Sequence, residues 1–290
     1  MSTKSVQSSI IPAVETMEGA GVTVHRTIGS PALRNYDPFL LLDHLSSGNP
    51  QDYIAGFPPH PHRGFVTFTY IIDGDMEHKD SLGNTGRLGP GGAQWMKAAS
   101  GVVHSEMPSQ ENGLLRGFQL WINLPAAHKM DAPAYQEYKS EAFPVVETRE
   151  GSVKVLAGRY GDVVAPVVDE ITQVSYLDVQ VNPGKRFSHT LSSGNNSFLY
   201  LFEGSGQLDG QEIPLHALAI PGQCYVEYLA GSQGARFLLV SGKPIGEPVV
   251  QYGPFVMNTR EEIEQAIHDY QTNSFVRERA WTNRKQKTEG

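Results

Sequence analysis

Short runs of alternating or clustered apolar residues, separated by glycine and proline, recur along most of the chain. These runs are rich in β-branched and aromatic residues, which is typical of strands rather than helices. The clearest runs are FVTFTYII (65–72), GFQLWINL (117–124), VSYLDVQV (174–181), SFLYLFEG (197–204) and RFLLVSG (236–242). Together with 30 glycines and 19 prolines in 290 residues, the pattern predicts an all-β fold of antiparallel strands joined by tight turns.

One segment near the C-terminus has helical rather than strand-like spacing. After GPFVMN, either Asn258 or Thr259 is placed to cap a helix, and two glutamates follow in the first turn, where the helix dipole favours acidic residues. Ile263, Ala266 and Tyr270 then recur on one face. The sequence therefore predicts one short C-terminal α-helix.

The chain also contains a weak internal repeat. FTYIIDGDMEH resembles FLYLFEGSGQL, and GPGGAQWMKAAS resembles IPGQCYVEYLAG further along. Between matching strands the first copy carries GVVHSEMPSQENGLLR, whereas the second copy has only SQGA. Such likeness can also arise by accident of β-rich composition. Read as a repeat, it predicts two tandem barrels at about residues 20–130 and 150–245.

The corresponding domain division is residues 1–134 for an N-terminal metal-binding domain and 135–290 for a C-terminal metal-free domain with the helix. A chain of 290 residues is long enough for two hydrophobic cores. We expect a monomer.

Charge and composition narrow the functional class. The net charge is −8, which disfavours direct nucleic-acid binding, because phosphate contacts need clustered lysine and arginine. The N-terminus lacks the basic and apolar pattern of a secretory signal, and no apolar run is long enough to cross a bilayer. Cys224 is the only cysteine, so no internal disulfide can form. We expect a cytoplasmic protein without a membrane partner, found in the nucleus as well if the host is eukaryotic.

Candidate chemistry begins with FPPHPHRGF, where His60 and His62 lie two residues apart. In an extended strand such residues point to the same face, so both imidazoles can reach one ion. Pro61 fixes its own φ and lacks an amide donor, which predicts a stiff strand at a sheet edge or barrel rim. The motif alone is equally typical of surface or capping histidines.

A second motif of the same spacing lies in VVHSEMP, inside the segment that the second copy lacks. His104 and Glu106 also lie two residues apart, so a second strand offers an imidazole and a carboxylate. If both strands face one point, three nitrogens and one oxygen converge. This donor set suits Fe(II), Mn(II), Co(II), Ni(II) or Zn(II), and a six-coordinate ion would keep two positions open. The other histidines sit singly, and surface or core roles are expected for them.

Two tandem barrels with these motifs resemble the bicupin architecture and, more closely, the pirin family. The resemblance extends from near the N-terminus to the last helix. It rests on NYDPFLLLDHL, FPPHPHRGF, GDMEHKDSLGNTG, GPGGAQWM, HSEMP, GFQLWINLP and QYGPFVMNT. It implies an iron-binding N-terminal cupin, a metal-free C-terminal cupin, and metal ligands at His60, His62, His104 and Glu106. By position it also implies a pocket lined by Asp43, Phe57, Arg63 and Met107.

One residue departs from the family pattern. Pirins commonly read HPHRGFE, and this chain has Val66 at the position of that glutamate. Strand alternation predicts that position 66 shares the face of His60 and His62. Loss of a carboxylate there would remove a charge near the ion and alter its tuning.

The resemblance leaves two functional hypotheses open. The first is a quercetin (flavonol) 2,3-dioxygenase that uses Fe(II), or Mn, Co, Ni or Zn, with a flavonol-like molecule and O₂ as substrates. Glu106 would be its catalytic base, provided that it swings off the ion. The alternative is a non-catalytic regulatory protein in which the metal or its redox state controls binding of a protein partner.

Overall fold

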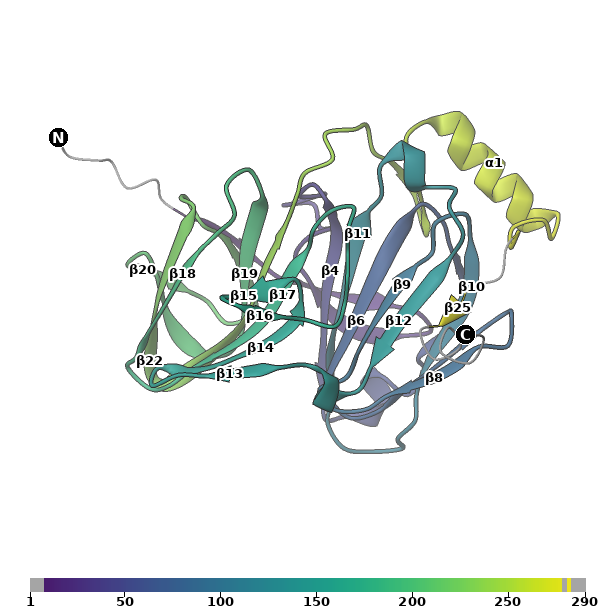
Figure 1. The fold of residues 1–290 in the computed structure, drawn as a ribbon. Coiled ribbons are helices and arrows are strands. Elements are labelled where there is room, and N and C mark those ends of the chain that lie inside the picture. The colour runs from purple at the N-terminus through teal and green to yellow at the C-terminus, as the bar shows by residue number, and fades with distance from the viewer. Residues whose placement is uncertain (1–7, 278–280, 283–290) are drawn as a thin grey trace. The chain divides into compact units, whose positions relative to one another are not determined.

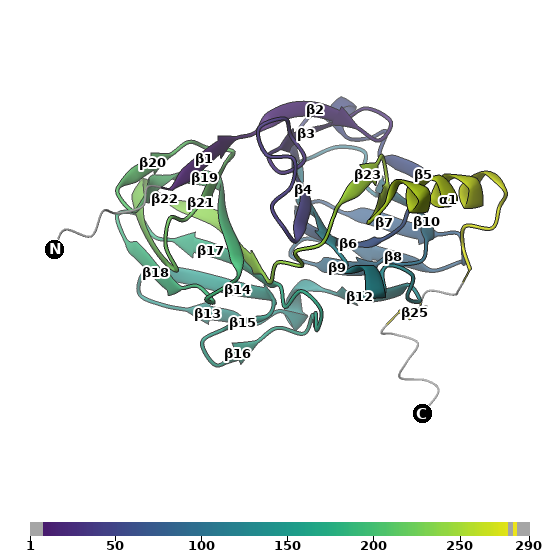
Figure 2. The ribbon, with the colours of Figure 1, turned by 90° about the horizontal axis from the view of Figure 1, so that it is seen from above.

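The computed structural model describes residues 8–277 and 281–282, which form two compact, β-rich units (Figures 1 and 2). The N-terminal barrel comprises residues 15–29, 38–141 and 245 onward. The C-terminal barrel comprises residues up to 14, then 30–37 and 142–244. Strands account for most of the regular structure, and the predicted all-β fold is confirmed.

The N-terminal barrel is built from two sheets. The larger one follows the order β2-β3-β4-β11-β6-β9-β12-β25, and the smaller one follows β5-β10-β7-β8. In the larger sheet the strands are β2 (Val14–Glu18), β3 (Val22–Arg26), β4 (Phe39–Ser47), β11 (Leu115–Asn123), β6 (Phe65–Asp73), β9 (Ala93–Lys97), β12 (Ala134–Tyr138) and β25 (Trp281–Thr282). In the smaller sheet they are β5 (Phe57–His62), β10 (Val102–Pro108), β7 (Met76–Asp80) and β8 (Thr85–Leu88). Within the described residues, the pairs from β3 to β12 and those of the smaller sheet are antiparallel, whereas β12 and β25 run parallel.

The long apolar run at residues 65–72 forms β6, which lies between β11 and β9 near the middle of the larger sheet. Eight of its nine residues are buried, so both of its faces are covered. A strand covered on both faces reads as a continuous apolar run instead of an alternating one. A core cluster that includes Val24, Leu45, Ile71 and Leu115 packs inside this barrel.

The C-terminal barrel is organised around two long strands, β19 (Asn196–Leu208) and β22 (Tyr225–Gly242). Its sheet follows β1-β21-β19-β22-β17-β14-β13, with β18 added to β22 and β20 added to β19. The remaining strands are β1 (Ser9–Pro12), β21 (Ala217–Ile220), β17 (Ser175–Val181), β14 (Gly151–Ala157), β13 (Val145–Glu147), β18 (Arg186–Thr190), β20 (Gln211–Ile213) and the separate pair β15 (Arg159–Tyr160) and β16 (Val163–Val164). Leucine, valine and aromatic side chains, among them Phe187, Tyr228 and Phe237, fill its core.

The predicted helix is α1 (Arg260–Gln271). Thr259 is its N-cap: its hydroxyl accepts from the Glu262 amide, and the Glu262 carboxylate accepts from the Thr259 amide, which makes a capping box. Ile263 and Ala266 pack against residues that include Phe255 of the hairpin β23 (Val250–Tyr252) and β24 (Phe255–Met257). Short 3-10 turns occur at Pro50–Asp52, Ala126–His128 and Ser140–Ala142.

The compact units are discontinuous in sequence. Residues after 244, including α1, group with the N-terminal barrel, and Figure 2 shows α1 and β23 on the side where β5 and β10 lie. The sequence-based division into residues 1–134 and 135–290 instead assigns α1 to the C-terminal domain. That division stays a prediction. Among the described residues, no helix combines the length and apolar character that a membrane span requires.

Candidate metal centre

The two histidine motifs lie on neighbouring strands. β5 and β10 pair antiparallel, with His60 opposite His104 and His62 opposite Val102. Residues directly opposite each other in a sheet share a face, with their Cβ atoms about 5 Å apart. β5 is the last strand of its sheet, where prolines are tolerated because only one side of the strand must form ladder bonds. Strand pairing therefore brings the two motifs to one face.

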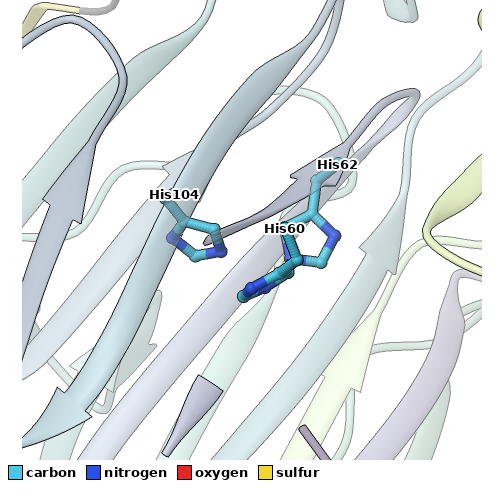
Figure 3. A group of neighbouring side chains, drawn as sticks. All are labelled: His60, His62 and His104. Carbon is cyan, nitrogen blue, oxygen red and sulfur yellow. The ribbon is translucent and has the colours of Figure 1, made fainter. Parts of the chain in front are cut away.

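The three imidazoles converge on one point, as Figure 3 shows. One ring nitrogen from each of His60, His62 and His104 lies within 4.8 Å of the other two. The Nε2 atoms of His60 and His62 are 2.9 Å apart. The ring centroid of His104 is 4.5 Å from that of His60 and 4.9 Å from that of His62. Among the described residues, this is the group with the spacing of a metal site.

The contacts of the Nδ1 atoms favour Nε2 as the nitrogen that binds a metal ion. His60 Nδ1 is 2.8 Å from the carbonyl oxygen of Pro58, so Nδ1 carries the proton and Nε2 presents its lone pair toward Nε2 of His62. His104 Nδ1 is 3.3 Å from Nδ1 of His78, while its buried Nε2 has no partner among the described residues. A buried nitrogen without a partner is costly unless something binds it. Both observations fit a cation held by Nε2 atoms.

Burial keeps these rings neutral. Loss of solvent lowers the pKa of His60 and holds the pKa values of His62 and His104 well below their usual range. The neighbouring histidines lower the pKa values of His62 and His104 further, since two imidazolium ions cannot share so small a volume. Neutral imidazole is the form that binds metal. The donor set thus fits a divalent cation.

Glu106 lies beside this group and not within it. It follows His104 on β10, across a register irregularity relative to β5. The Thr69 hydroxyl lies 3.2 Å from Glu106 Oε1. Burial raises the pKa of Glu106 to about 7, although the bond to Thr69 lowers it in part. A carboxyl with a pKa near neutrality can accept and release a proton under working conditions.

His60 and His62 line a cavity of about 590 Å³ within the N-terminal barrel. This volume is in the range of small-molecule sites. Its apolar wall includes Phe57, Leu41, Ile71, Met76, Phe118 and Trp121, and its polar groups include Glu18, Arg26, Asp43, Thr69, Glu106 and Gln119. Arg26 donates to both carboxylate oxygens of Asp43, at 2.7 and 2.6 Å. The cavity therefore combines an aromatic wall with a small number of fixed polar groups.

Comparison with known proteins identifies the family that has this architecture. The pirin model matches residues 21–122, and the pirin C-terminal cupin model matches residues 176–276. The chain belongs to the pirin family. The two barrels are accordingly cupin domains, and the bicupin fold implied by the motifs is confirmed.

Relatives from distant organisms align with most of this chain. A Pseudomonas aeruginosa protein provisionally named quercetin 2,3-dioxygenase is 48% identical, over 87% of this chain and 92% of that protein. Human pirin is 41% identical over 98% of each chain. The crystal structure of a quercetin 2,3-dioxygenase from Acinetobacter baumannii has a TM-score of 0.85 and 29% identity, and covers 92% of this chain and 96% of that one.

Two of the four pocket residues implied by the pirin pattern line the cavity, namely Asp43 and Phe57. Arg63 and Met107 are not among its lining residues. The Arg63 guanidinium turns away to donate to the Ser100 carbonyl at 2.6 Å and to Asp269 at 2.7 Å. Met107 neighbours Glu106 on β10 and so faces the opposite side of the strand. The structure thus places Arg63 and Met107 away from the cavity lining, and the roles of all four residues in substrate binding stay predictions.

Val66 also lies differently from the sequence-based expectation. On β6, Thr69 and Ile71 face the cavity, so Val66, three residues before Thr69, faces the other side of the sheet. Alternation does not continue from His62, because β5 ends there and Gly64, with φ +91°, turns the chain into a different sheet. The expectation that position 66 shares the histidines' face is wrong. A carboxylate there would not point toward the three histidines.

Sequence reasoning missed His78, which was treated as an isolated histidine. It lies on β7, opposite Glu106 in the register with β10, and its ring packs 5.0 Å from that of Tyr135. Burial lowers the pKa of His78 to about 4, so its ring is neutral, and its Nδ1 lies within 3.3 Å of Nδ1 of His104 on the side of that ring away from Nε2. The sequence carries no signal for this contact, since it depends on strand pairing.

Proposed function

We propose that this pirin is a metal-dependent quercetin (flavonol) 2,3-dioxygenase. The observation that supports it most directly is the neutral three-histidine group, two members of which, His60 and His62, line a cavity large enough for a flavonol. The relatives and structural neighbours that carry this activity in their names add support.

His60, His62 and His104 would hold one divalent cation through Nε2, and Glu106 would supply a carboxylate oxygen. We assign Fe(II), with Mn(II), Co(II), Ni(II) and Zn(II) as competitors for the same donors. When bound, the cation supplies Lewis acidity and, for iron, the redox chemistry that O₂ activation requires.

The residues of the cavity have separate tasks in this proposal. The rings of Phe57, Phe118 and Trp121 pack against a planar substrate and exclude water. With its carboxylate swung away from the cation, Glu106 takes the proton of the flavonol 3-hydroxyl at Oε2, because burial raises the pKa of the unbound carboxyl to about 7 and so makes it a usable base at neutral pH. The Arg26–Asp43 pair presents polar atoms to the hydroxyl groups of the substrate.

The test is anaerobic loading of the purified protein with each metal, followed by quercetin and O₂. We expect loss of flavonol absorbance with release of carbon monoxide in the Fe(II) sample. His104→Ala should abolish this turnover, whereas the matched control His189→Ala, a histidine of the C-terminal barrel, should not. Absence of turnover with all of the metals, although the protein binds them, would refute the proposal and favour a non-catalytic, partner-binding role.

A further inference from the structure

Thr69 is a buried hydroxyl at the proposed site that no sequence motif singles out. It lies on β6, where it faces the cavity directly across from Gln119 of β11. Both side chains line the cavity, and 6% of the Thr69 surface is exposed. A polar pair in such a position is placed to act on a third group.

That third group is Glu106. The Thr69 Oγ1 atom lies 3.2 Å from Glu106 Oε1 and 2.6 Å from the side-chain oxygen of Gln119. Among the described residues, Thr69 is the side chain that hydrogen-bonds the Glu106 carboxylate. A hydroxyl has one hydrogen to donate and two lone pairs with which to accept. It cannot donate to two oxygens at once.

In the structure Gln119 turns Oε1 toward Thr69, and a half-turn of this amide would resolve the conflict. It exchanges Oε1 for the NH₂ group, which then donates to Thr69 Oγ1. The hydroxyl hydrogen is thereby directed at Glu106 Oε1. In this arrangement Gln119 fixes the rotation of the Thr69 hydroxyl, and Thr69 fixes the carboxylate.

We propose that Thr69, locked by Gln119, is a positioning residue that holds Oε1 of Glu106 and leaves Oε2 to face the histidines. The inference rests on the proposed metal site. A glutamate side chain has several free torsions, and ordering them opposes binding unless they are already fixed. The register irregularity between His104 and Glu106 means that strand pairing alone does not set this side chain. The hydroxyl supplies the missing constraint.

The experiment is a double-mutant cycle on metal affinity in the full-length protein, with Co(II) as the probe and titrations followed by its visible spectrum. The variants are Thr69→Val, Glu106→Ala and the double variant. Thr67→Val is the control, since Thr67 lies two residues earlier on the same face of β6, is also buried and has no hydrogen bond to Glu106. Thr69→Ser restores a hydroxyl.

We expect Thr69→Val to weaken Co(II) binding by about 10- to 100-fold, the usual effect of removing a group that orients a ligand. Thr69→Ser should recover most of the affinity, and Thr67→Val should match the wild type. In the Glu106→Ala background, Thr69→Val should add no further loss, because the carboxylate that it orients is gone. The Co(II) spectrum of Thr69→Val should shift toward that of Glu106→Ala.

Two outcomes would overturn the inference: wild-type affinity in Thr69→Val, or losses that simply add in the double variant. Thermal unfolding of Thr69→Val and Thr67→Val shows whether a change in Co(II) affinity is accompanied by a general loss of stability. Failure of the proposed site itself would look different, since the wild type would then bind no Co(II) or His104→Ala would bind it normally.

Discussion

Replacement of Asp269 by asparagine should destabilise the N-terminal barrel severely. Asp269 of α1 accepts from Arg63 at 2.7 Å, and only 4% and 2% of the two side chains are exposed. The guanidinium also packs 4.4 Å from the ring centroid of Phe275, so it has no access to water. Breaking a buried pair on one side leaves an uncompensated charge and typically costs about 3–5 kcal/mol. Asparagine keeps the shape of the side chain while removing its charge.

Thermal unfolding measures this cost. A loss of about 3 kcal/mol corresponds to a decrease of roughly 6–12 °C in the melting temperature of a domain of 150–250 residues. The matched control is Glu264→Gln, an exposed acidic position on the same helix, which should change stability by less than about 0.5 kcal/mol. Equal melting temperatures for Asp269→Asn and the wild type would refute the view that this buried pair anchors α1.

The same carboxylate predicts a pH dependence. Hydrogen bonds from Arg63, Gln265 and Arg277, which outweigh burial, lower the pKa of Asp269 from 3.8 to about 2. Between these values the unfolded chain binds more protons than the folded one, so its contribution to stability is complete above pH 3.8 and is lost as the pH falls toward 2. Acid titration of stability should show this loss in the wild type and lack it in Asp269→Asn. The same slope in both proteins would contradict the assignment.

Three further outcomes are expected. Lys129→Met should lower the free energy of unfolding in urea by several kcal/mol. The buried ammonium donates to the Gly64 carbonyl at 2.8 Å, the Asn123 side chain at 2.6 Å and the Val256 carbonyl at 3.0 Å. Each buried acceptor left without a donor costs about 1–3 kcal/mol. A cost below about 1 kcal/mol would contradict this account. Gly64→Ala should be strongly destabilised, because its new Cβ would lie 1.8 Å from the Val256 carbonyl oxygen and the residue would keep a φ of +91°. Thermal melting followed by circular dichroism measures this loss, and a melting temperature equal to that of the wild type would argue against the contact. Metal affinity in calorimetric titrations should fall as the pH drops through about 7, the pKa to which burial raises Glu106, and again well below pH 6.5, where the histidines with their lowered pKa values take up protons; an affinity unchanged between pH 8 and pH 4 would exclude this donor set.

The sequence predicted those parts of the site that depend on one strand at a time. HPH and HSE each place two donors on one face because side chains alternate along any strand, and the structure brings the three histidines together. The cap of α1 was likewise readable, because a capping box spans only a few adjacent residues. Local periodicity is enough for features of this kind.

Features that depend on register between strands were not readable. The contacts of His78 with His104 and of Thr69 with Gln119 join residues far apart in the sequence. The orientation of Val66 was misjudged for a related reason. Side chains alternate regularly between two faces only within one strand, and the turn at Gly64 separates β5 from β6. No property of the residues themselves indicates where that parity changes.

The difference between the two barrels follows from the same topology. In the C-terminal barrel, β22 runs for 18 residues without interruption, pairing with β18 near its start and with β17 and β19 further along. The N-terminal barrel has separate strands β9, β10 and β11 in the corresponding stretch, because the additional residues around VVHSEMP divide it. β10 is thereby released to pair with β5 in the smaller sheet, and that pairing sets His104 opposite His60. That the histidine group with metal-site spacing occurs in the N-terminal barrel, among the described residues, is therefore a consequence of where the chain is divided, as much as of which residues it carries.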